Sequence, residues 1–261
     1  MRRAALLLIA NFAATATFAG AYLESADTSP DSPKDNARVT KMWFDGGRMR
    51  TENGGKGEGA VAIFKNNAMY IIDPASKSYR ILDKAALEQL SAQLAAARKK
   101  LEASMANMPP EKRQAMEKML GKSGSAKPKR VLKNTGRTET VAGFKCTLWE
   151  ATEDGKKDEE LCVAAPGNVP GGDDMMTTLR SVGEMLKGFS DSFGGNQTDN
   201  TWRDLDTVKG VPVMMRQFED GKVSLENRLA VARKESVNAA QFEVPAGYTE
   251  KKISMGPAGA Q

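Results

Sequence analysis

The sequence predicts an α+β fold in which a curved antiparallel sheet carries helices in or over its concave face. Short apolar runs alternate with turn residues at regular spacing, which is typical of an antiparallel meander. Other long segments repeat their apolar residues at helical spacing instead. The stretch VAGFKCTLWEATEDGKKDEELCVAA at 141–165 reads as a hairpin with apolar residues on both faces, as in a sheet that is covered on both sides.

Residues 1–21 have the pattern of a secretory signal peptide. The basic start MRR precedes an apolar core, and small residues then offer cleavage after Ala16, Ala19 or Ala21. Asn11 interrupts this core, and no later segment reaches ~18 continuous apolar residues, so we predict no transmembrane segment in the mature chain. We expect a periplasmic or secreted protein after Sec-type signal cleavage.

The composition excludes several classes of site. The 261 residues carry a net charge of +5 and contain no histidine, which removes the usual general base, the usual zinc ligand and every Ser-His or Cys-His pair. We therefore predict no catalytic residue, no metal site and no cofactor, and leave a hydrolase that uses carboxylates alone as a minor alternative. The basic run at 122–133 is interpreted as a solvated linker, and no nucleic-acid binding is predicted.

Six strands are predicted before the first helix. Asp45-Gly46-Gly47 supplies the turn of one hairpin and Asn66-Asn67 the turn of another. Arg48 and Arg50 alternate on one strand and therefore share a face, where we expect surface ion pairs; a ligand carboxylate or lipid headgroup is the alternative partner. The predicted strands are 22–26, 38–44, 48–52, 60–65, 68–73 and 78–82.

Residues 83–107 change to helical period, with an apolar stripe on one face. Asp83 is the expected N-cap, Pro109-Pro110 ends the helix, and residues 111–120 form a second helix. We expect the stripe of this insertion, at about 84–120, to pack on the sheet; docking of a partner is the alternative. The stripe consists of Leu87, Leu90, Leu94, Ala97, Leu101 and Met108.

The hairpin at 141–165 turns at Asp154-Gly155, a dipeptide suited to positive φ, and folding about this turn brings Cys146 and Cys162 opposite one another. An even cysteine count in an oxidising compartment predicts a disulfide between them, with two buried free thiols as the alternative. Strand alternation places Phe144, Cys146 and Leu148 on one face.

The last third of the chain combines one more helix with returning strands. Residues 173–193 form a second helical insertion with a methionine-rich apolar face, read either as a docked helix or as a mobile lid. Strands follow at 210–218 and 222–234, then one helical turn at 236–240. Residues 251–261 are predicted to be a disordered tail.

Several motifs, taken in order, resemble those of a known family. They are Trp43 to Glu52 (WFDGGRMRTE), Met69 to Pro74 (MYIIDP) with Lys77-Ser78-Tyr79, Val141 to Cys146 (VAGFKC), Gly210-Val211-Pro212 and Phe242 to Tyr248 (FEVPAGY). The sequence is similar, over about 38–250, to a family of periplasmic domains of unknown function whose fold is similar to that of the lipoprotein carriers LolA and LolB. The resemblance implies a single domain at 22–250, built as a curved half-barrel closed by helices over an apolar cavity.

Two functions from different classes follow. The first is a non-enzymatic protein that binds or carries a lipid or another apolar ligand in the half-barrel. The second is an envelope interaction or stress-related domain with a filled core, which uses its helical hairpin to dock a protein partner. The predicted ligand-binding residues of the first are Trp43, Met49, Ile63, Met69, Ile71, Phe144, Leu148, Met185 and Phe189.

Overall fold

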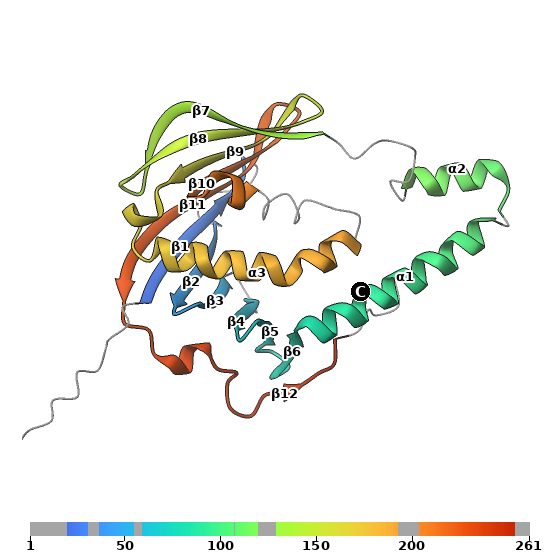
Figure 1. The fold of residues 1–261 in the computed structure, drawn as a ribbon, viewed down its shortest axis with the longest axis horizontal. Coiled ribbons are helices and arrows are strands. Elements are labelled where there is room, and N and C mark those ends of the chain that lie inside the picture. Colours follow the sequence, from blue (N-terminus) through green and yellow to red (C-terminus); the bar gives the residue numbers. More distant parts are fainter. Residues whose placement is uncertain are drawn as a thin grey trace, which may run out of the picture.

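The computed structural model describes residues 20–30, 37–54, 59–106, 108–119, 129–192 and 204–253; the side chains of 115–119 and 188–192 lie outside that description. Twelve strands form one sheet in the order β12-β6-β5-β4-β3-β2-β1-β11-β10-β9-β8-β7. The sheet curves around helix α3 and stays open instead of closing into a barrel (Figure 1). The predicted fold, an α+β half-barrel with helices on its concave side, is confirmed.

The elements follow the predicted segments closely. The strands are β1 (Gly20–Thr28), β2 (Arg38–Asp45), β3 (Arg48–Gly54), β4 (Val61–Lys65), β5 (Ala68–Asp73), β6 (Ser78–Leu82), β7 (Arg130–Val141), β8 (Phe144–Glu153), β9 (Lys156–Ala164), β10 (Val211–Glu219), β11 (Lys222–Glu235) and β12 (Thr249–Glu250). The helices are α1 (Lys84–Ala106), α2 (Pro110–Met119), α3 (Gly172–Ser192) and the short η2 (Pro166–Asn168) and η3 (Ala239–Phe242). The signal peptide and the tail beyond residue 253 fall outside the described residues.

Apolar clusters pack on both faces of the sheet, and two of them lie on opposite sides of β2, β3 and β4. Phe44 and Met49 point toward α3 and pack with Met176 in the larger cluster. Side chains alternate along a strand, so Trp43 (beside Phe44) and Ile63 (beside Phe64) point the other way. They pack beneath Phe242 of η3. The sheet is therefore buried on both faces around β2, β3 and β4.

Strand β1 lies at the centre of the sheet and joins its two halves. It pairs with β2 on one side and with β11 on the other, although these strands are far apart in sequence. Its first residues already have ladder partners: Gly20 pairs with Glu235, and Ala21 pairs with both Lys234 and Phe44. Ala21 is 1% exposed.

This placement distinguishes the three predicted cleavage sites. Cleavage after Ala21 would remove two paired residues from the central strand, whereas cleavage after Ala16 or Ala19 leaves β1 whole. We therefore expect the mature protein to begin at Gly20 or a few residues earlier. N-terminal sequencing of the exported protein tests this, and a mature chain that begins at Tyr22 would contradict it.

The cysteine hairpin differs from its prediction in register. Cys146 and Cys162 form the predicted disulfide, with Cα atoms 5.3 Å apart. They are not directly opposed, because Leu148 is the ladder partner of Cys162. A β-bulge near Asp158 shifts the pairing away from the spacing that the turn alone would set.

The C-terminal segment adds a strand that the sequence analysis missed. After β11 the chain passes along the outer face through η3, and β12 then pairs with β6 in parallel, as the one parallel pair among the described strands. The segment between β11 and β12 is long enough for the chain to cross the sheet and run in the same direction as β6. A tight turn between neighbouring strands gives antiparallel pairing instead.

Helix α1 departs from the prediction that its apolar stripe packs on the sheet. Leu87 and Leu90 are buried at its start, but residues 95–100 are all exposed and the helix projects away from the sheet (Figure 1). Helix α2 folds back at its far end, where Arg113 donates hydrogen bonds to the carbonyl oxygens of Met105 (3.1 Å) and Ala106 (2.9 Å). The Arg113 side chain thus caps the C-terminal end of α1 and stabilises the junction between the two helices. We call α1 and α2 together the α1–α2 arm.

Within the described parts of the chain, no helix is both long enough and apolar enough to cross a membrane.

Candidate functional site

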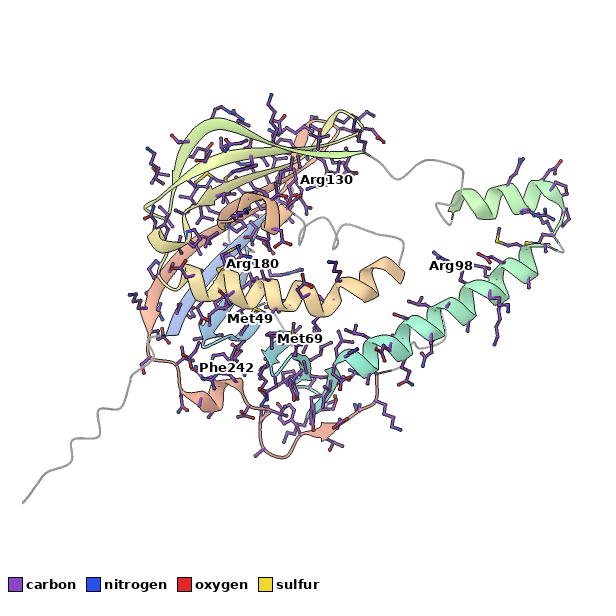
Figure 2. The ribbon with its side chains drawn as sticks, viewed as in Figure 1. Met49, Met69, Arg98, Arg130, Arg180 and Phe242 are labelled. Carbon is purple, nitrogen blue, oxygen red and sulfur yellow. A yellow bond between two sulfur atoms is a disulfide. The ribbon has the colours of Figure 1, made fainter. Side chains whose placement is uncertain are left out.

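Methionine side chains from both α3 and the sheet meet on the concave face. The first row of the sheet, Phe44–Met49–Phe64–Met69, runs across four neighbouring strands by direct ladder pairing. Met49 and Met69 lie beside α3 in Figure 2, and α3 contributes Met175, Met176 and Met185 to the same cluster. Phe44 and Phe64 are no more than 2% exposed, so α3 fills the concavity above this row. Thioether side chains are flexible, which makes this contact adaptable.

A second row continues the concave face beyond α3 and is only partly covered. It runs Met42–Thr51–Ala62–Ile71–Arg80 across β2 to β6, each residue paired directly with the next. Ile71 is 36% exposed, and the other four side chains are half-buried. We call this row the open strip. It combines apolar or small side chains with one cation at its end.

Arg80 differs from the two arginines singled out in the sequence. Arg48 pairs with Asp45 and Arg50 pairs with Glu52 at 2.6 Å, so the expected surface ion pairs are present. Among the described residues, no carboxylate forms an ion pair with Arg80. The open strip thus ends in a cation whose charge the described part of the chain does not neutralise.

A buried acidic cluster lies where β7, β9 and the helical turn at 204–208 meet. The Arg130 guanidinium donates to Asp204 and Asp158, each at 2.6 Å, and also to Glu159. Burial raises the pKa of Glu159 despite its contact with Arg130, and the charges of Asp204 and Asp158 act in the same direction. The Arg130 side chain binds all three carboxylates. We therefore interpret this cluster as a structural ion-pair network that joins these elements.

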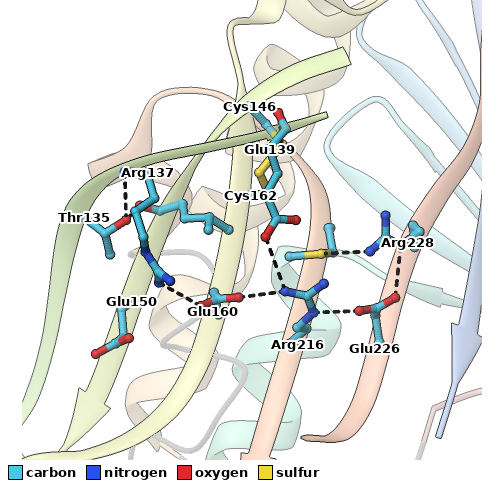
Figure 3. A network of polar contacts seen from close by, with 12 residues as sticks. Thr135, Arg137, Glu139, Cys146, Glu150, Glu160, Cys162, Arg216, Glu226 and Arg228 are labelled. Atoms are coloured by element: carbon cyan, nitrogen blue, oxygen red, sulfur yellow. Dashed lines mark hydrogen bonds and ion pairs between the residues drawn. A yellow bond between two sulfur atoms is a disulfide. The ribbon is translucent and has the colours of Figure 1, made fainter. Parts of the chain in front are cut away.

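A second polar network crosses β9, β10 and β11 beside the disulfide (Figure 3). Glu160, 6% exposed, accepts hydrogen bonds from Lys157 (2.8 Å) and Arg216 (2.9 Å). Arg216 also donates to Glu226 (2.6 Å). Burial opposes the ionisation of Glu160, but these hydrogen bonds outweigh it and lower the pKa of the carboxyl group.

In the part of the chain that the structure describes, no group of three or more histidine, cysteine, aspartate or glutamate side chains is arranged so that it could hold a metal ion.

Comparison with known proteins assigns the family. The family described as "Domain of unknown function (DUF4412)" matches residues 97–248, which is more than half of the chain. The chain belongs to this family. The membership of an unknown-function family that the motifs predicted is therefore confirmed. No curated protein matches the sequence.

Solved structures that match this DUF4412 protein share little sequence with it. An uncharacterized conserved protein from Thermus thermophilus is 8% identical with a TM-score of 0.43, over 90% of this chain and 91% of that one. The Pseudomonas aeruginosa MucA/MucB complex gives 8% identity and a TM-score of 0.38, over 88% of this chain and 57% of that one. A second structure, MucB in complex with MucA(peri), is 10% identical with a TM-score of 0.39, over 87% of this chain and 55% of that one. The chain thus spans little more than half the length of both MucB chains.

The nine predicted ligand-binding residues of the DUF4412 protein do not form one surface. Met49, Met69, Ile71 and Met185 share the concave side with α3. Trp43 and Ile63 lie on the opposite face beneath Phe242, which Figure 2 shows away from α3. Phe144 and Leu148 belong to the same apolar cluster as Met49 and lie near the disulfide, where Leu148 pairs with Cys162. Phe189 lies in α3, but its side chain is outside the description.

Sequence analysis of the DUF4412 protein predicted Ile71 as a ligand-binding residue but missed Arg80 and the other three residues of the open strip. Strand alternation does place Arg80 and Leu82 on one face of the strand at 78–82, so part of the signal was present. The pattern carries no information on which strands lie beside that face. Only the ladder shows that Arg80 lies opposite Ile71.

Proposed function

We propose that the protein is an exported, non-enzymatic binding protein that takes a lipid or another apolar ligand on the concave side of its half-barrel. The observation that carries the proposal is the open strip: apolar and small side chains that stay half-exposed beside the methionine-rich contact with α3. Each CH₂ group of a ligand buried there contributes about 0.8 kcal/mol, so an acyl chain binds without specific polar contacts. The disulfide suits an oxidising compartment outside the cytoplasm.

The filled concavity determines how such a ligand binds. The row under α3 is closed, with Phe44 and Met176 almost fully buried. A chain that lies on the open strip instead needs no displacement of α3, and the flexible Met42 and Met69 side chains adjust to its shape. Ligand binding at the edge of α3 is therefore compatible with a packed core.

Native mass spectrometry of the mature protein from its own periplasm, followed by denaturing extraction, tests this function. We expect a co-purifying lipid or fatty acid that is released on unfolding. Ile71→Asp places a charge in the strip and should reduce the loaded fraction at least severalfold, because a carboxylate resists burial against an acyl chain. Val131→Asp is the matched control, since Val131 is 47% exposed on the edge strand β7. A wild-type protein with no bound lipid and no uptake of a fluorescent fatty acid would rule the function out.

The α1–α2 arm supports a second candidate function, the docking of an envelope protein. Its middle is exposed on all sides at residues 95–100, and Leu94 and Leu101 are only half-buried. Arg98 on this projecting part is labelled in Figure 2. A helix that leaves its own sheet in this way presents a surface to other molecules. The lipid-free result described above would favour this function.

A further inference from the structure

We propose that the open strip recognises a long acyl chain that ends in a carboxylate, with Arg80 as the anchor for the charged end. The proposal rests on the proposed function and adds the chemical class of the ligand, its direction along the strip and the residue that selects it.

The geometry of the strip sets the length and direction of the ligand. Its five residues stand on five adjacent strands, so the distance from Met42 to Arg80 is four steps of about 4.8 Å, roughly 19 Å in all. A long saturated chain lying across the strands covers that distance. On one side it contacts the methionine-rich row under α3, and on the other side it borders polar side chains such as Asn53, which hydrogen-bonds with Thr40 (3.0 Å).

The charge at one end of the strip selects the headgroup. Met42, Thr51, Ala62 and Ile71 carry no charge, and Arg80 is the last residue of the row. It is half-buried, and no carboxylate among the described residues pairs with it. A guanidinium offers a planar pair of N–H donors that matches a carboxylate. The uncharged stretch thus takes the hydrocarbon and Arg80 takes the ionised end.

The positions and partners of the other arginines on neighbouring strands explain why Arg80 is the anchor. Arg48 and Arg50 lie on the outer face and are held by Asp45, Glu52 and the Gln241 carbonyl oxygen (3.0 Å from Arg50 Nη1). Their charges are already matched, and α3 lies on the other side of the sheet.

The test compares palmitate with the uncharged alcohol of the same chain length, using displacement of a fluorescent acyl probe from delipidated protein. We expect the wild type to bind palmitate roughly tenfold more tightly than the alcohol, as a charge-assisted hydrogen bond in a half-buried position provides. Arg80→Gln should remove this preference by lowering the affinity for palmitate to that for the alcohol, and Arg80→Lys should restore part of it. Arg98→Gln makes the same charge change on the exposed part of α1 and should keep the full preference.

The outcomes separate this inference from the proposed function. Equal binding of the two ligands by the wild type, or an unchanged preference in Arg80→Gln, would overturn the role of Arg80 while the strip still binds acyl chains. Binding of neither ligand by the wild type would overturn the proposed function itself. Thermal melting of each variant confirms that the comparison is made between folded proteins.

Discussion

Replacing Arg130 with methionine is expected to lower the free energy of unfolding by about 3–5 kcal/mol at neutral pH, because it leaves buried carboxylates without their cation. The Arg130 side chain is 12% exposed, and its partners Glu159 and Asp204 are 11% and 9% exposed. These groups join β7, β9 and the turn at 204–208, so the loss affects contacts that are far apart in sequence. Urea unfolding of the variant and the wild type measures the difference.

The destabilisation should depend on pH in a defined direction. Burial already raises the pKa of Glu159. The Glu159 carboxyl group therefore binds a proton more readily in the folded state than in the unfolded state. The free-energy cost of ionising this group in the folded protein grows as pH rises through that pKa. Removing Arg130 raises the pKa further. The deficit of Arg130→Met should therefore shrink as pH falls from 7 to about 4.

Arg137→Met is the matched control for this prediction. Arg137 is 60% exposed and makes one ion pair, at 3.3 Å to Glu160, which Lys157 and Arg216 also hold. Its loss should cost less than about 1 kcal/mol. If Arg130→Met were as stable as Arg137→Met at neutral pH, the buried acidic cluster would not need its cation, and our account of it would be wrong.

The double substitution Cys146→Ala/Cys162→Ala is expected to cost about 3 kcal/mol, the effect of opening a loop of this size in the chain-entropy model. The two cysteines are 16 residues apart in sequence, and both are buried, at 2% and 0% exposure. Their disulfide lies in the apolar cluster beside the Glu160–Arg216–Glu226 network. The loss should therefore appear as a lower urea midpoint for the whole domain.

A reducing agent provides the control for the disulfide. It should lower the midpoint of the wild type toward that of the double variant and leave the double variant itself unchanged. A wild type that keeps its midpoint after complete reduction, confirmed by thiol titration, would show that the disulfide adds nothing to stability.

Acid should act on the second network in the opposite direction from the Arg130 cluster. Burial disfavours the ionised forms of Glu160 and Glu226, but hydrogen bonds from Arg216 and its neighbours lower the pKa of both carboxyl groups. Their contribution is present above the pKa of the unfolded state and is lost as pH falls through the lowered folded values. The two clusters thus respond to acid with opposite signs within one sheet.

Local patterns in the sequence determined the secondary structure and the covalent link. Alternation and turn residues such as Asp45-Gly46-Gly47 predict strands within a few residues of those observed, because both depend on neighbours in the chain. The disulfide followed from the count and spacing of the cysteines. The family was recognisable from the order of short motifs.

The tertiary structure alone decided which residues share a surface. Alternation shows that Trp43 and Phe44, or Ile63 and Phe64, differ in face, but it does not show which face meets α3. The bulge near Asp158, the departure of α1 from the sheet and the parallel pairing of β12 depend on contacts between distant segments, which no local period encodes. The open strip ending at Arg80 exists only through the pairing of five strands, so it became visible once their register was known.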